Sequence, residues 1–151
     1  GRKGWLKSAM ERLHKFFRLP PGERIVLVQA WALLVVMDLA LRMMPFQRLR
    51  ARCDHAGRKK PGTSSEPVPS VSRLAWLVEV AGRLTPVTAT CLKKALVLSW
   101  LLGRHGIAST LQIGVARHGD ALTAHAWLEQ QGQVIFGLPE CEGYRPLVPI
   151  R

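Results

Sequence analysis

The chain contains a cysteine and a histidine in surroundings that could support nucleophilic catalysis. Cys91 begins the apolar run "CLKKALVLSWLLGRHGI", and His125 lies within the later segment "ALTAHAWLEQQGQVIFG". A cysteine attacks as its thiolate, and an imidazole within about 2.6–3.2 Å can take the thiol proton and later give it to a leaving amine. We therefore treat Cys91 and His125 as a candidate catalytic pair.

The segment around Cys91 predicts a helix that begins at this residue. Thr90 is a favourable N-cap, so Cys91 would occupy the first helical position. Free amides and the positive end of the helix dipole favour a thiolate over a thiol at such a position, and the same amides can stabilise an oxyanion. The alternative is a structural role, since a free cysteine is often a small buried residue.

His125 lies in a segment whose alternation predicts a strand. It shares one face of that strand with Thr123 and Trp127, and the opposite face carries Ala124, Ala126 and Leu128. A lone histidine on a strand is usually structural. Trp127 also has two interpretations, as a wall over the Cys–His pair or as an ordinary core aromatic.

The periodicity of the sequence changes between the two candidate residues. Helices are expected over 71–84 and from Cys91 onward, the second with Gly103 or Gly106 as its C-cap. Three strands joined by tight turns are expected over 109–118, 122–130 and 133–137. The tail that follows contains three prolines and is expected to be irregular. This order predicts an α+β fold with a small antiparallel sheet.

The runs "CLKKALVLSWLLGRHGIASTLQIGV" and "AHAWLEQQGQVIFG" together resemble the transglutaminase-like cysteine peptidase of lasso-peptide biosynthesis, in the microcin-processing family. The shared features are a cysteine heading a helix, a "GI" bend, an "L-x-IGV" strand and the "AHAW" segment with its following Glu. The match covers about residues 70–150, and the helix over 22–46 is similar to the family's N-terminal helix.

The resemblance implies a papain/transglutaminase-like fold with a helical N-terminal region. It also implies a peptidase that removes the leader from a ribosomally made precursor peptide. Cys91 would attack the carbonyl at the leader–core junction, and His125 would act first as base and then as acid. The implied partners are the precursor peptide, a separate leader-recognition protein and a macrocyclising enzyme, with no cofactor.

The third member of a catalytic triad is not evident. The resemblance implies an acid beside the histidine, commonly Asp, and a tight hairpin at "QGQ" places His125 opposite Gly137 or Leu138. Glycine has no side chain to orient the imidazole, which leaves Glu140, a backbone carbonyl or a water as substitutes. Glu129 lies about 13 Å along the same strand, at about 3.3 Å per residue, and is too far away to pair with His125.

Length, charge and cysteine content limit the wider interpretation. The 151 residues fit one core, divided into a helical N-terminal region 1–50, a linker or mobile loop 51–70 and a catalytic domain 71–151. The formal net charge of +12 favours anionic partners, but no nucleic-acid-binding motif accompanies it.

The chain has an odd number of widely spaced cysteines, which favours a reducing cytoplasm: Cys53, Cys91 and Cys141. The "CDH" segment at Cys53–His55 lacks the further ligands that a metal site needs.

The N-terminal part is rich in apolar, helix-periodic sequence. Residues 1–19 predict a basic amphipathic helix, and 25–44 are apolar and long enough to cross a bilayer. Asp38, Arg42 and Gln29 oppose insertion, at about 2.5–3.5 kcal/mol for each central charge. A helix that is buried or covered by a partner is therefore favoured, and the N-terminal helices are the expected docking surface.

Two other functions are compatible with the sequence. The same Cys–His pair supports transglutaminase-type acyl transfer, in which an amine rather than water resolves the acyl-enzyme. A non-catalytic peptide-binding or membrane-associated module is favoured by Gly137 and by the apolar segment 25–44.

Overall fold

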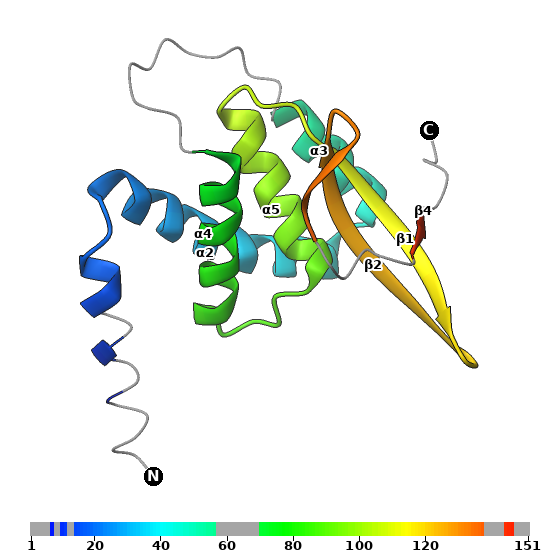
Figure 1. The fold of residues 1–151 in the computed structure, drawn as a ribbon, viewed down its shortest axis with the longest axis horizontal. Coiled ribbons are helices and arrows are strands. Elements are labelled where there is room, and N and C mark those ends of the chain that lie inside the picture. Colours follow the sequence, from blue (N-terminus) through cyan, green and yellow to red (C-terminus); the bar gives the residue numbers. More distant parts are fainter. Residues whose placement is uncertain (1–6, 8–9, 12–13, 57–69, 138–143, 147–151) are drawn as a thin grey trace.

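The computed structural model describes residues 7, 10–11, 14–56, 70–137 and 144–146, and it shows a helical layer with a small sheet packed against it (Figure 1). In chain order the elements are α2 (Pro21–Met43), α3 (Phe46–Ala56), α4 (Val71–Leu84), α5 (Cys91–Arg104), β1 (Thr110–His118), β2 (Ala121–Gln130), β3 (Gln133–Phe136) and β4 (Arg145–Pro146). The predicted α+β arrangement is confirmed, and the expected strands and the helix over 71–84 lie within a single residue of their observed bounds.

One apolar core joins the N-terminal helices to the sheet. Helix α5 contacts α2, α3, α4, β1 and β2, so it lies at the centre of this core. The fully buried leucines come from all the main layers and include Leu34 of α2, Leu74 and Leu77 of α4, Leu98 of α5 and Leu128 of β2. Burial of each such side chain stabilises the fold by about 1.5–3 kcal/mol. The helices that precede Cys91 therefore belong to the body that holds it.

Helix α2 presents two different faces. Its inner face is buried against α4 and α5 and includes Leu27, Ala30 and Leu34. Its opposite side exposes apolar residues at helical spacing, and we call this stripe the α2 outer face: Ile25, Val28, Val36, Leu39 and Met43. By length and composition α2 could cross a membrane, with a mean hydropathy of 2.0. In this fold, however, the inner face of the helix is part of the core.

The sheet has the order β3-β2-β1-β4. Strands β1 and β2 form a long antiparallel hairpin in which Gly114 pairs with His125, and its far end extends beyond the helices (Figure 1). A bulge between Leu128 and Glu129 shifts the pairing of β2 with β3. The tail departs from the predicted irregular structure at Arg145–Pro146, which pair with β1 as a two-residue edge strand.

Helix α3 extends into the segment 51–70 that the sequence predicts as a linker or loop. Residues 51–56 are helical, because Leu49 anchors α3 in the core and arginine, frequent in the rest of the helix, has a good helix propensity without needing burial. Residues 57–69 lie outside the described part of the chain, as do residues 1–6, 8–9 and 12–13 of the predicted basic helix over 1–19, whereas residues 14–17 of it are helical. The division into domains stays a prediction.

Candidate active site

Cys91 is the first residue of α5, as predicted. Thr90 is the N-cap, and its Oγ1 accepts a hydrogen bond from the Lys93 amide at 3.4 Å. The amides of Cys91 and Leu92 have no hydrogen-bond partner among the described residues, which is usual for the first turn of a helix. The cysteine is half-buried. Two free amides are therefore available to an anion close to the thiol.

The start of α5 is tied to α2 through a charged cluster. Lys93 Nζ lies 2.5 Å from Asp38 Oδ1 and donates to the Thr88 carbonyl at 2.7 Å. Arg42 Nε lies 3.1 Å from Asp38 Oδ2. The side chains of Asp38 and Lys93 are each only 12% exposed. The acid in the apolar helix therefore belongs to an ion pair that also holds the loop before Cys91.

Replacing Asp38 with asparagine will lower the melting temperature at neutral pH. It will also make the melting temperature fall less as the pH is lowered. The hydrogen bond from Lys93 holds the pKa of the Asp38 carboxyl below its usual range. The stabilisation is therefore present above about pH 4, the ordinary carboxyl range, and is lost as the pH falls through the lower folded-state pKa. Thermal melts of both proteins from neutral to strongly acidic pH measure this. The same loss of stability with acid in the two proteins would contradict the role given to Asp38.

His125 is held on β2 by ring and backbone contacts. Its Nε2 lies 3.4 Å from the carbonyl oxygen of Gly137. The ring stacks on Trp127, with centroids 6.5 Å apart and planes inclined by 18°, and the Tyr144 ring centroid lies 5.4 Å away. A carbonyl can only accept a hydrogen bond, so Nε2 carries the proton in this contact. In the neutral ring Nδ1 is then the basic nitrogen.

Trp127 backs the histidine from within the sheet. It is only 3% exposed, and its Nε1 donates to Glu129 Oε1 at 2.9 Å. The indole covers Gly114, where an added Cβ would lie 2.6 Å from the ring. With this burial Trp127 is a core aromatic that also stacks on His125, and it is not among the residues that line the cavity of Cys91 and His125 described below.

Cys91 and His125 line one cavity of about 540 Å³. The other lining residues come from two helices and the edge of the sheet: Glu79, Arg83, Lys94, Val134, Ile135, Phe136 and Gly137. Within the described part of the chain, no hydrogen bond joins the Cys91 thiol to the His125 ring. Catalytic hydrogen bonds are often long before substrate binds and shorten in the substrate complex. The fold thus brings the two predicted residues to the same cavity, with room for a peptide segment between its walls.

The place of the third triad member, next to the ring of His125, is taken by a backbone carbonyl group. The pairing of β2 with β3 follows the predicted register next to the turn, and the bulge shifts it further along. The carbonyl oxygen of Gly137 nevertheless lies beside His125. This contact corresponds to the backbone alternative expected from the sequence. Glu140 lies outside the described residues. Glu129 accepts hydrogen bonds from Trp127 and Gln112 instead of pairing with the histidine.

Three charged residues of the cavity were missed by the sequence reasoning: Glu79, Arg83 and Lys94. Glu79 and Arg83 lie one turn apart on α4, on the side opposite the buried Leu77. That spacing is visible in the sequence and predicts a shared polar face. Nothing local in the sequence indicates that this face borders the start of α5.

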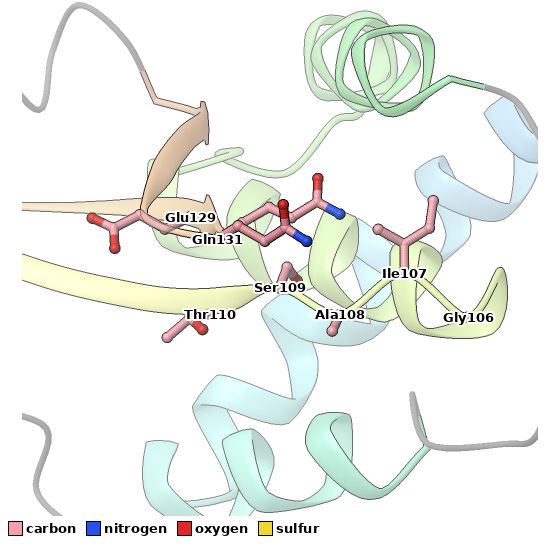
Figure 2. Close-up of a pocket in the computed structure, with 8 residues that line it drawn as sticks. Gly106, Ile107, Ala108, Ser109, Thr110, Glu129 and Gln131 are labelled. Atoms are coloured by element: carbon pink, nitrogen blue, oxygen red, sulfur yellow. The ribbon is translucent and has the colours of Figure 1, made fainter.

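A second cavity of about 360 Å³ lies at the other end of α5. It is lined by the connection from Gly106 to Thr110 and by Glu129–Gln131 at the end of the hairpin, as Figure 2 shows. Helix α5 has 14 residues and is therefore about 20 Å long at a rise of about 1.5 Å per residue. The second cavity is thus well separated from Cys91, and its lining contains neither cysteine nor histidine.

Comparison with known proteins gives one family. The profile of the transglutaminase-like superfamily matches residues 31–149. Searches of curated proteins and of solved structures found no match. The matched region begins within α2 and includes Cys91, His125 and Gly137, so it contains both sides of the cavity.

Proposed function

The chain belongs to the transglutaminase-like superfamily, and on this basis we propose that it is a cytoplasmic cysteine peptidase that removes the leader from a lasso-peptide precursor. The observation that carries the proposal is the shared cavity of Cys91 and His125, with free amides at the start of α5. The superfamily supports cysteine-dependent acyl chemistry. The narrower substrate class is supported by the resemblance of the segments around Cys91 and His125.

The reaction uses groups already placed around the cavity. Nδ1 of His125 takes the Cys91 thiol proton, and Sγ attacks the scissile carbonyl carbon. The amides of Cys91 and Leu92 stabilise the oxyanion. Collapse of this intermediate breaks the C–N bond, and the imidazolium returns its proton to the leaving amine. Water, deprotonated by the same imidazole, then hydrolyses the thioester to release the acid and restore the thiol.

The Gly137 carbonyl takes the place of a side-chain acid in this scheme. By accepting from Nε2, it orients the ring and fixes which nitrogen is basic. A carbonyl dipole stabilises an imidazolium less than a full negative charge does. We therefore expect a modest catalytic rate compared with a Cys-His-Asp triad.

The proposal includes partner proteins, because the precursor peptide would be held for cleavage by a separate leader-recognition protein. The α2 outer face is apolar and exposed, on the side of α2 opposite the core. We expect the leader-recognition protein or the macrocyclising enzyme to cover this face. Partners at this position would leave the cavity of Cys91 free, because its lining residues come from other elements.

The proposed activity is tested by incubating the chain with its genomic neighbours, the precursor peptide and the leader-recognition protein, with and without a primary amine. We expect two fragments whose masses add up to the precursor plus one water, with no amine adduct. An amine adduct on the peptide would instead establish acyl transfer as the reaction. An intact precursor in every sample would contradict the peptidase assignment.

A further inference from the structure

Arg83 places a positive charge in the cavity that Cys91 and His125 line, with no ion-pair partner in the part of the chain that the structure describes. It lies one turn after Glu79 on α4, at a spacing that allows a salt bridge. Glu79 pairs instead with Lys94, whose Nζ lies 2.9 Å from Glu79 Oε2. Arg83 is exposed and has no hydrogen bond or ion pair among the described residues. These three side chains therefore leave one net positive charge in the cavity.

The surroundings of Arg83 strengthen the effect of this charge. The edge strand β3 also borders the cavity, with Val134, Ile135 and Phe136 among the lining residues. An apolar wall keeps water away from one side of a nearby charge, so Arg83 is screened from its exposed side only. A guanidinium also binds a carboxylate through two parallel N–H donors, which fixes orientation as well as charge.

We propose that Arg83 determines specificity by binding a carboxylate of the peptide next to the bond that Cys91 attacks. The carboxylate is the side chain of an Asp or Glu, because the bond at the leader–core junction is internal to the precursor and has no free C-terminus beside it. This inference rests on the proposed function, because it takes the cavity to be the place where the peptide binds. It adds a chemical requirement to the substrate, which is a negative charge beside the scissile bond.

The charge preference of the cavity is measurable without the natural substrate. Iodoacetate and iodoacetamide alkylate the same thiolate, and they differ in that the first carries a carboxylate. The ratio of their rate constants at Cys91, followed by peptide mapping, cancels the fraction of thiolate present. We expect Arg83→Gln to lower the iodoacetate-to-iodoacetamide ratio by about three- to tenfold at low ionic strength, and less at high salt.

Two further variants make the test specific. Glu79→Gln removes the negative partner of Lys94 and should raise the ratio above that of the native chain. Arg104→Gln removes the same charge at the far end of α5, about 20 Å away, so it should lower the ratio less than Arg83→Gln does, and should have no effect near 0.15 M salt, where charges are screened over about 8 Å. A ratio unchanged in Arg83→Gln, or lowered equally in Arg104→Gln, would overturn the inference. Failure of both reagents to label Cys91 would contradict the proposed function as well, because both need an accessible thiol.

Short peptides test whether Arg83 binds a side-chain carboxylate. One peptide carries a single Glu and the other carries Gln in its place, and both have an amidated C-terminus. Each is tested for protection of Cys91 against iodoacetamide in the native chain and in Arg83→Gln. We expect the Glu peptide to protect the native chain better than Arg83→Gln, and the Gln peptide to protect the two proteins equally. Equal protection of both proteins by both peptides would contradict recognition by Arg83.

Discussion

Replacing His125 with alanine will slow leader removal by about 10²–10⁴-fold, the usual contribution of a positioned acid–base group. The variant keeps Cys91 and the amides at the start of α5, so it retains the nucleophile and the oxyanion donors. It lacks the group that takes the thiol proton and protonates the leaving amine. Single-turnover rates with excess enzyme measure this loss directly, because they separate the chemical step from product release.

A matched control is available for the His125 variant. His105 is the C-cap of α5, at the opposite end of the helix from Cys91. His105→Ala should leave the single-turnover rate within a small factor of the native value. A His125→Ala chain that cleaves as fast as native would remove the histidine from the mechanism, and equal losses in both variants would indicate a general effect on folding.

Placing an aspartate at Gly137, where the resemblance leads one to expect an acid, will reduce both stability and activity. Gly137 has φ +104°, a region that L side chains rarely adopt, and an added Cβ would lie 2.7 Å from Trp127 Cβ. The backbone strain alone is of order 1–3 kcal/mol, which lowers the melting temperature by roughly 2–12 °C for a chain of this length. Displacement of Trp127 and of the Gly137 carbonyl would also release the ring of His125.

The control for Gly137→Asp is an aspartate at another glycine of positive φ. Gly119 has φ +62°, and an added Cβ there meets nothing within 4 Å. Gly119→Asp should therefore cost less than Gly137→Asp, because aspartate tolerates the left-handed region when it has space. Melting temperatures and leader-removal rates of the two variants measure this difference. A Gly137→Asp chain that is as stable as native and cleaves faster would show that the carbonyl contact is not required.

The elements that carry the candidate pair could be predicted because their signals are local. Thr90 caps α5 and Cys91 begins it, as the sequence indicates. Of the two C-cap candidates, Gly103 lies within α5, whereas Gly106 follows the cap with φ +73°. Trp127 shares a face with His125 because a strand alternates. Each of these features depends on residues that are neighbours in the chain.

Features that depend on packing between distant segments could not be predicted. The bulge in the pairing of β2 with β3 leaves no pattern in the sequence, yet it affects how Gly137 meets His125. The pairing of Arg145–Pro146 with β1 uses backbone groups that every sequence has. The salt bridge between Lys94 and Glu79 joins two helices through side chains whose partners are set by the core, and it leaves Arg83 without an ion pair among the described residues.

The central claim is that the thiol of Cys91 performs the reaction, and comparing Cys91→Ala with the native chain tests it most directly. Both proteins are mixed with precursor and leader-recognition protein, and the released leader is quantified by mass spectrometry. Cys141→Ala serves as the control for loss of a thiol. Removing a catalytic nucleophile costs roughly 10⁴–10⁶-fold in rate, so we predict no detectable leader from Cys91→Ala and native amounts from the control. Equal leader release by Cys91→Ala and the native chain would contradict the account.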